Sequence, residues 1–167
     1  MKKFELTNEF ITNMFGTKLF RIRALVEFGD VEAGELGGYV EKESNLGHDD
    51  NAWVYGDARV YDNALVYDNA RVYGDAQVSG DARVYDNARV YGDVCGNGDY
   101  AYAHGFGSVN RTTTFFRLKD GGVGVRCGCF YGTLAQFRDK IRETHGETKK
   151  AQEYLMLADL MKLRFEK

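Results

Sequence analysis

Hydrophobic and polar positions alternate with a strict period of six between Asn51 and Gly92. Seven consecutive units, such as DARVYD, carry Asp or Asn first, Ala second, Val fourth and Gly or Asp last. In an extended chain, the second and fourth residues of a unit point to one face, and the third and fifth point to the other. The pattern therefore predicts one short strand and one corner per unit, with the Ala and Val side chains in a core.

A six-residue unit is too short to fold alone, so each unit must bury its apolar face against further units in a solenoid. Gly, Asp and Asn at the unit boundaries tolerate the backbone of tight corners. The third and fifth positions are predicted to face outward. They are occupied by Trp53, Arg59, Leu65, Arg71, Gln77, Arg83 and Arg89, and by Tyr55, Tyr61, Tyr67, Tyr73, Ser79, Tyr85 and Tyr91.

The repeats resemble the hexapeptide-repeat left-handed parallel β-helix, in which a small residue follows an aliphatic one by four places, as Ala58 follows Val54. The resemblance implies a mainly β fold with three units per coil, so that residues 18 apart stack about 4.8 Å from one another. Under this arrangement two outward columns form. They consist of Trp53, Arg71 and Arg89, and of Tyr55, Tyr73 and Tyr91.

A narrower resemblance extends over most of the chain. The run from Phe20 to Tyr55, the hexads, and the run from Val125 to Phe137 look like small hexapeptide-repeat proteins of bacteriophages and prophages. Such proteins are often labelled as transferases or polymer-forming proteins. The resemblance implies a homotrimer whose coils pack side by side, in the cytoplasm of the host cell.

Three segments follow from these patterns: strands and a cap at residues 1–38, the hexapeptide-repeat β-helix at 39–107, and an appendage at 111–167. In the first, strands are predicted at Phe4–Leu6 and Leu19–Val26. The run NLGHDD, residues 45–50, can be threaded in phase with the hexads. The terminal coils of a solenoid are expected to be atypical because they must end the stack.

The appendage is predicted to have the order ββαα, and it either caps the last coil or mediates assembly. Strands at 113–118 and 124–130 flank the turn sequence KDGG. A helix begins at Thr133 with a capping box to Gln136 and stops at Gly146, and a second helix follows over about 147–165.

Composition narrows the function classes. The net charge of −3 divides into −4 for residues 1–50, −4 for 51–110 and +5 for 111–167. This modest basic excess is typical of solvated helices, so we expect neither a nucleic-acid nor a membrane partner. The N-terminus lacks the apolar core of a signal peptide, which favours a soluble cytoplasmic protein.

The three cysteines, Cys95, Cys127 and Cys129, are expected to be free thiols because no secretory signal accompanies them. Cys127 and Cys129 would point to one face of a strand and lie in the hairpin core. No second cysteine pair completes a zinc site, so we predict no metal. His145 lies downstream without changing this conclusion.

The outward tyrosines and arginines are the leading candidates for a function. A ladder of stacked tyrosines also arises simply because neighbouring coils repeat. Tyr and Arg are, however, enriched in partner interfaces. We therefore expect a non-catalytic phage accessory module that engages a host protein or captures a small anionic, nucleotide-like ligand, a role consistent with counter-defence. The predicted binding residues are Arg71, Arg89, Tyr73, Tyr91, Arg83 and Tyr85.

Two alternatives stay open. In acyltransferases of the resembled fold a histidine acts as general base, and His104 would stack near Asp86 under 18-residue threading. His48 is the other histidine near the coils. The central hexads lack loop excursions that would hold an acyl coenzyme A, so the sequence favours a protein without catalysis or cofactor. The other alternative is a structural or scaffold protein.

Overall fold

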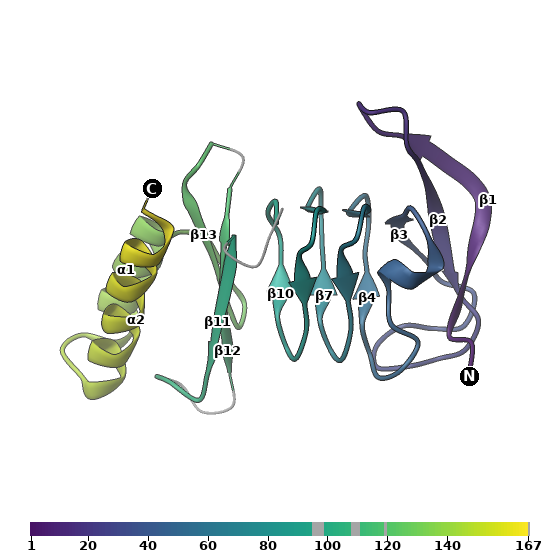
Figure 1. Cartoon of the computed structure of the whole chain (residues 1–167). Coiled ribbons are helices and arrows are strands. Elements are labelled where there is room, and N and C mark those ends of the chain that lie inside the picture. Colours follow the sequence, from purple (N-terminus) through teal and green to yellow (C-terminus); the bar gives the residue numbers. More distant parts are fainter. Residues whose placement is uncertain (95–98, 108–110, 119, 167) are drawn as a thin grey trace.

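The computed structural model of the chain describes residues 1–94, 99–107, 111–118 and 120–166. The molecule is elongated, with three parts in sequence order (Figure 1). An antiparallel hairpin forms one end, a stack of short parallel strands forms the middle, and an antiparallel sheet covered by two helices forms the other end.

The N-terminal part is built from two long antiparallel strands, β1 (Phe4–Thr12) and β2 (Lys18–Ala24). The first is longer than the predicted Phe4–Leu6. Strand β2 also pairs antiparallel with β3 (Leu36–Val40). Since β3 continues into parallel pairing with the stack, one sheet joins the hairpin to the repeats.

The middle part consists of seven two-residue strands, one per hexad. They are β4 (Trp53–Val54), β5 (Arg59–Val60), β6 (Leu65–Val66), β7 (Arg71–Val72), β8 (Gln77–Val78), β9 (Arg83–Val84) and β10 (Arg89–Val90). Each pairs in parallel with the strand 18 residues away, as Val54 does with Val72, so the chain visits three sheets in turn. The Ala and Val side chains of the hexads are at most 1% exposed, which confirms the predicted core.

The 18-residue spacing fails at both ends of the stack. Leu46 pairs with Val66, an offset of 20 residues, whereas Val78 pairs with Val94, an offset of 16. The in-phase threading of residues 45–50 was therefore wrong, because Leu46 takes the place of a core Val. Asn45 is buried beside it, and its side-chain amide donates to the carbonyl of Ala64 at 2.9 Å.

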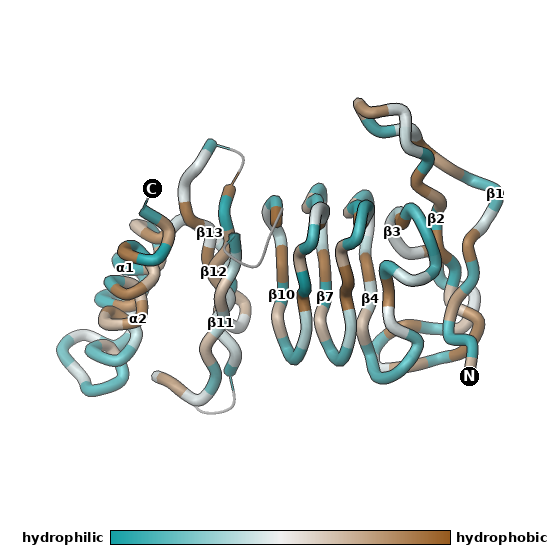
Figure 2. The backbone as a smooth tube through the Cα atoms, viewed as in Figure 1, coloured by the Kyte–Doolittle hydropathy of each residue, from teal (hydrophilic) through white to brown (hydrophobic). Residues whose placement is uncertain are grey.

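The corners use left-handed backbone, as the Gly and Asp residues there predict. Asp62, Asp68 and Asp86 have φ between 53° and 58°. The carboxylate of Asp68 accepts a hydrogen bond from the backbone N–H of Asp86 at 3.2 Å, one coil further on. Hydrophilic residues gather at these corners, while hydrophobic residues occupy the strands between them (Figure 2).

The C-terminal part is a four-stranded antiparallel sheet in the order β11-β12-β13-β14. Its strands are β11 (Tyr100–His104), β12 (Thr112–Arg117), β13 (Val123–Cys127) and β14 (Phe130–Thr133). Two of them were predicted. The segment β11, which the threading placed in the last coil, instead pairs antiparallel with β12. Cys95 and Lys119, on which parts of the threading and of the predicted turn rest, lie outside the described residues.

Helices α1 (Leu134–His145) and α2 (Lys149–Phe165) cover the sheet on the side away from the stack (Figure 1). The capping box of α1 is confirmed, because Thr133 accepts from the N–H of Gln136 and the Gln136 side chain accepts from the N–H of Thr133. Gly146 ends the helix with φ of 58°.

Candidate functional site

The predicted column of Trp53, Arg71 and Arg89 is closed at its N-terminal end by the protein itself. Trp53 is fully buried rather than outward, because Phe28 and Phe4 pack against its indole. Arg71 forms an ion pair with Asp30 at 2.5 Å, and the side chain is 17% exposed. Of the three, Arg89 is the exposed one.

Arg71 also donates a hydrogen bond to the hydroxyl of Tyr55 at 3.0 Å. Burial alone would raise the pKa of Asp30, but hydrogen bonds from Arg71 and Tyr55 outweigh it and lower that pKa. The charge of Arg71 is therefore neutralised within the chain, and this residue anchors the loop that carries Asp30.

The tyrosine column forms as predicted. The ring centroids of Tyr55 and Tyr73, and those of Tyr73 and Tyr91, are both 4.6 Å apart with nearly parallel planes. Beyond Tyr91 the C-terminal sheet continues the contact, with Tyr131 at 5.0 Å and the guanidinium of Arg126 at 5.1 Å. Tyr73 and Tyr91 therefore present edges, rather than open faces, to solvent.

Arg83 and Tyr85 lie on a different sheet from the other predicted binding residues. The ring of Tyr85 stacks on Tyr67 at 5.4 Å. The backbone carbonyl of Arg83 accepts a hydrogen bond from the hydroxyl of Tyr100, whose ring borders a shallow hollow together with Tyr85 and Arg164. The six predicted residues thus fall into two separate groups.

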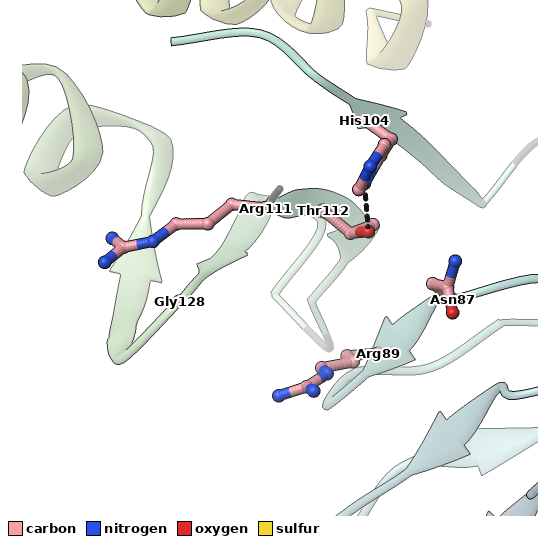
Figure 3. A pocket seen from close by; sticks show the side chains of 6 residues that line it. All are labelled: Asn87, Arg89, His104, Arg111, Thr112 and Gly128. Carbon is pink, nitrogen blue, oxygen red and sulfur yellow. Dashed lines mark hydrogen bonds between the residues drawn. The ribbon is translucent and has the colours of Figure 1, made fainter. Parts of the chain in front are cut away.

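A second hollow brings together residues that the sequence left apart. It lies where the stack meets the C-terminal sheet and has a volume of about 280 Å³ (Figure 3). We call it the seam pocket. It is lined by Asn87, Arg89, His104, Arg111, Thr112 and Gly128.

The two parts of the fold hold the seam pocket in place from both sides. The backbone N–H of Arg89 in β10 donates to Oγ1 of Thr114 in β12 at 3.2 Å, which fixes the last coil against the sheet. Gly128, at φ of 58°, makes room for Arg111, because a Cβ there would lie 2.9 Å from a guanidinium nitrogen of that side chain.

The seam pocket carries positive charge without compensation from its own lining. Arg89 and Arg111 are exposed and form no ion pair with any residue that the structure describes, and the lining contains no carboxylate. Arg89 and Arg111 both border this hollow, although their side chains point in different directions (Figure 3). Guanidinium groups without an ion-pair partner are suited to bind carboxylate or phosphate oxygens.

A third guanidinium, that of Arg126, lies over the ring of Tyr91. Burial raises the pKa of Tyr91, whereas the charges of Arg126 and Arg89 partly oppose that rise, so both cations act on the same phenol. The Nε atom of Arg126 is buried and has no hydrogen-bond partner in the described part of the chain. A buried donor without a partner is uncommon in folded proteins.

His104 lines the seam pocket but does not meet Asp86. Its Nδ1 lies 3.1 Å from Oγ1 of Thr112, whereas the carboxylate of Asp86 accepts from the hydroxyl of Tyr102. That hydrogen bond, together with burial, raises the pKa of Tyr102 to about 12. The predicted pair of His104 and Asp86 was wrong because β11 leaves the stack and turns antiparallel.

His48 serves the N-terminal cap. Its Nδ1 accepts from the backbone N–H of Lys3 at 3.1 Å, its Nε2 lies 2.9 Å from Glu43, and its ring stacks on Phe4. These contacts give it a structural role.

The two described cysteines do not share a face. Cys127 is buried and accepts from the hydroxyl of Thr113 at 3.2 Å, whereas Cys129 is exposed after the turn at Gly128. The expectation that both are buried was wrong for Cys129. Within the described ranges, no three His, Cys, Asp or Glu side chains lie together as metal ligands would.

Sequence reasoning missed Arg111 and Arg126. The strand alternation could have identified Arg126. It lies between Val125 and Cys127, whose side chains face the helices, so its own side chain faces the other side of the sheet. Arg111 follows the point where the six-residue period has ended, so its position could not be derived from that period.

Comparison with known families supports the repeat. The chain matches the family model of the YdcK beta solenoid repeat in five overlapping segments, at residues 52–67, 58–74, 64–80, 76–92 and 82–96. A search of the curated proteins gave no match. None of the described helices is long and apolar enough to cross a membrane. In the described part of the matched region, the strands from Trp53 to Val90 pair at 18-residue intervals, so this segment is a β-solenoid repeat similar to that of YdcK.

Proposed function

We propose that this protein is a non-catalytic binding module that captures a small anion in the seam pocket. The observation that carries the proposal is that Arg89, Arg111 and His104 line one hollow whose described lining contains no carboxylate. Arg89 lies in β10, His104 lies in β11, and Arg111 directly precedes β12. In a chain of net charge −3, such a concentration of unpaired positive charge favours a negatively charged ligand.

The size of the pocket narrows the ligand class. Its volume of about 280 Å³ lies just below the range for drug-sized ligand sites, about 300 to 1,000 Å³. A monophosphate ester or a comparable small anion fits this volume better than a dinucleotide. Arg89 and Arg111 would hold the phosphate oxygens, and Asn87 and Thr112 would offer neutral polar contacts.

The wider setting is part of the same proposal. The resemblance to phage and prophage hexapeptide-repeat proteins supports a left-handed parallel β-helix, a homotrimer and a cytoplasmic accessory role, in which capture of a host signal counters a defence. Native mass spectrometry of freshly purified protein would report the number of subunits and any retained ligand together.

Isothermal titration calorimetry with adenosine monophosphate, ribose 5-phosphate and inorganic phosphate tests the site, with uncharged adenosine as the ligand control. Arg89→Ala and Arg111→Ala should each weaken binding by about tenfold or more, since hydrogen bonds to charged groups contribute about 1.5–3 kcal/mol. Arg59→Ala is the matched variant, because it removes the arginine at the same repeat position on another sheet.

Binding of phosphate-bearing ligands that is lost in the two pocket variants and kept in Arg59→Ala would support the proposal. If the wild-type protein binds none of these anions at millimolar concentration, or if Arg59→Ala is as damaging as Arg89→Ala, the seam pocket is not the site.

One observation keeps acyl transfer as a second candidate, since His104 lies in the same pocket as the arginines that would suit the phosphates of an acyl coenzyme A. Thiol release from acetyl coenzyme A with added amines and alcohols would test it. Activity that His104→Gln abolishes without weakening ligand binding would favour catalysis over simple capture.

A further inference from the structure

The two C-terminal helices differ on the side that faces away from the sheet. Both bury apolar residues against the C-terminal sheet and each other. The outer face of α1 is charged, with exposed Asp139, Arg142 and Glu143. The outer face of α2 instead exposes Met156, Leu160 and Leu163, at 71%, 54% and 68%. A helix that is apolar on both faces is typical of one covered on both sides.

The spacing of these three residues indicates what covers them. Intervals of four and then three residues place them on one stripe, as in the seam between two associated helices. A partner helix must present the same spacing to fill the holes between them, and a second copy of α2 does so.

Charge also differs between the two flanks of the stripe. Asp159 and Glu166 lie on one flank, and Lys150 and Arg164 lie on the other. When two copies run parallel, the acidic flank of one helix meets the basic flank of the other, with Asp159 opposite Arg164 of the partner subunit. When they run antiparallel, flanks of like charge meet.

We propose that the outer face of α2 is a self-association surface on which copies of this chain pack in parallel through Met156, Leu160 and Leu163. The helix runs across the long axis of the molecule (Figure 1). The stacks of associated subunits therefore project outward from the helices. In this arrangement the copies do not touch along their coils, unlike the side-by-side coils that the resemblance to hexapeptide-repeat proteins implies. This surface is independent of the seam pocket.

The strength of association follows from the size of the stripe. Three side chains bury far less than the roughly 1,600 Å² of a standard stable interface. We therefore expect subunits that exchange and a mass that rises with concentration.

Sedimentation equilibrium between about 1 μM and 1 mM, the range of weak to moderate affinities, measures this association. Leu160→Glu and Leu163→Glu should remain monomeric at the highest concentration. Met14→Glu is the matched control, because Met14 is 90% exposed in the turn between β1 and β2, and these strands lie at the end of the molecule opposite α2 (Figure 1). Circular dichroism confirms that each variant is folded.

A wild-type protein that stays monomeric at about 1 mM, or an association that persists in Leu160→Glu, would overturn the proposal. The number of copies in the assembly is read from the same data. Loss of association would leave anion binding by the seam pocket intact, so the two proposals fail separately.

Charge reversal tests the parallel direction. Asp159→Lys and Arg164→Glu should each weaken association, and the double variant should restore it. In an antiparallel pair flanks of like charge meet, so a single reversal removes a repulsion or replaces it by another. Association that stays unchanged or becomes stronger in the single variants would therefore contradict the parallel arrangement. Asp159 also pairs with Arg138 in its own chain, so unfolding curves accompany each variant.

Discussion

The ring of Phe28 lies edge-on against the indole of Trp53, with centroids 5.3 Å apart. Trp53 occupies the repeat position that holds Arg71 and Arg89 in the later coils of the same sheet. The outward face of the stack is therefore covered at Trp53, because the N-terminal segment that carries Phe28 packs over it.

Truncation of this aromatic contact should loosen the N-terminal cap. We expect Trp53→Ala to lower the free energy of unfolding by about 3–5 kcal/mol, the usual cost of removing a buried aromatic side chain. Trp53→Phe should cost less, because it also removes an indole N–H that is buried without a partner among the described residues. Urea unfolding measures both. Leu65→Ala, at the same repeat position on another sheet, should cost less than Trp53→Ala, and equal costs would contradict this assignment.

The ion pair between Arg71 and Asp30 predicts opposite roles for two arginines of one column. Arg71→Ala should destabilise the protein by at most about 1 kcal/mol, because the Asp30 side chain is 62% exposed and water can replace its lost partner, and it should leave phosphate binding unchanged. Arg89→Ala should weaken phosphate binding and change stability little. Unfolding curves and calorimetric titration of both variants check this. If Arg71→Ala weakens binding as strongly as Arg89→Ala, the column acts as one surface and the division is wrong.

Two substitutions of Asp68 distinguish the contribution of backbone strain from that of hydrogen bonding at this corner. Its φ is 57°, and its carboxylate accepts from the N–H of Asp86. Asp68→Ala should lower stability by about 1–2 kcal/mol, because alanine is strained in left-handed backbone. In Asp68→Gly the strain is relieved while the same hydrogen bond is lost, so its cost should be smaller. Thermal unfolding of the two variants measures both costs. Equal losses of stability in Asp68→Ala and Asp68→Gly would show that backbone strain does not contribute at this corner.

Lys3 predicts a dependence of stability on pH. Its amino group is buried and donates to the backbone carbonyl of Ala52 at 2.9 Å. Burial lowers the pKa of Lys3 to about 8, although Asp50 and Asp49 oppose the shift. An unfolded chain keeps the ordinary lysine pKa of about 10.4 and so binds more protons than the folded one between these values. The contribution of Lys3 to the free energy of unfolding should therefore rise as the pH increases from 8 towards 10.

The comparison of Lys3→Met with the wild-type protein isolates this effect from other titrating groups. Above pH 8 the free energy of unfolding of the wild-type protein, relative to that of Lys3→Met, should increase by at most about 1.4 kcal/mol per pH unit. Between pH 6 and 7 this difference should change little. Urea unfolding at a series of pH values measures the difference, and a difference that stays constant to pH 10 would show that Lys3 is not perturbed.

The sequence predicted the interior of the repeats because strand alternation decides locally which side chains face inward. Val72 and Ala70 are fully buried for this reason. The ends were less predictable. The corner that follows Leu46 is two residues longer than those of the repeats, and the corner before Val94 is two residues shorter. The six-residue pattern indicates neither change.

The candidate site was predicted in part for the same reason. Arg89 was correctly placed on the outside of the stack, since its position follows from the period. Its neighbours in the seam pocket depend on an antiparallel sheet built from residues without that period. His104 was therefore assigned to a coil, and Arg111 was not considered.

Both ends of the stack are closed by antiparallel strands, while each inner coil contacts only its two neighbours. Whole groups of 18 residues can therefore be added or removed between these ends without altering either of them. Each such change would shift the N-terminal hairpin relative to the helices by about 4.8 Å, the distance between paired strands. The repeat thus works as a spacer whose length is set in discrete steps by the number of coils the gene encodes.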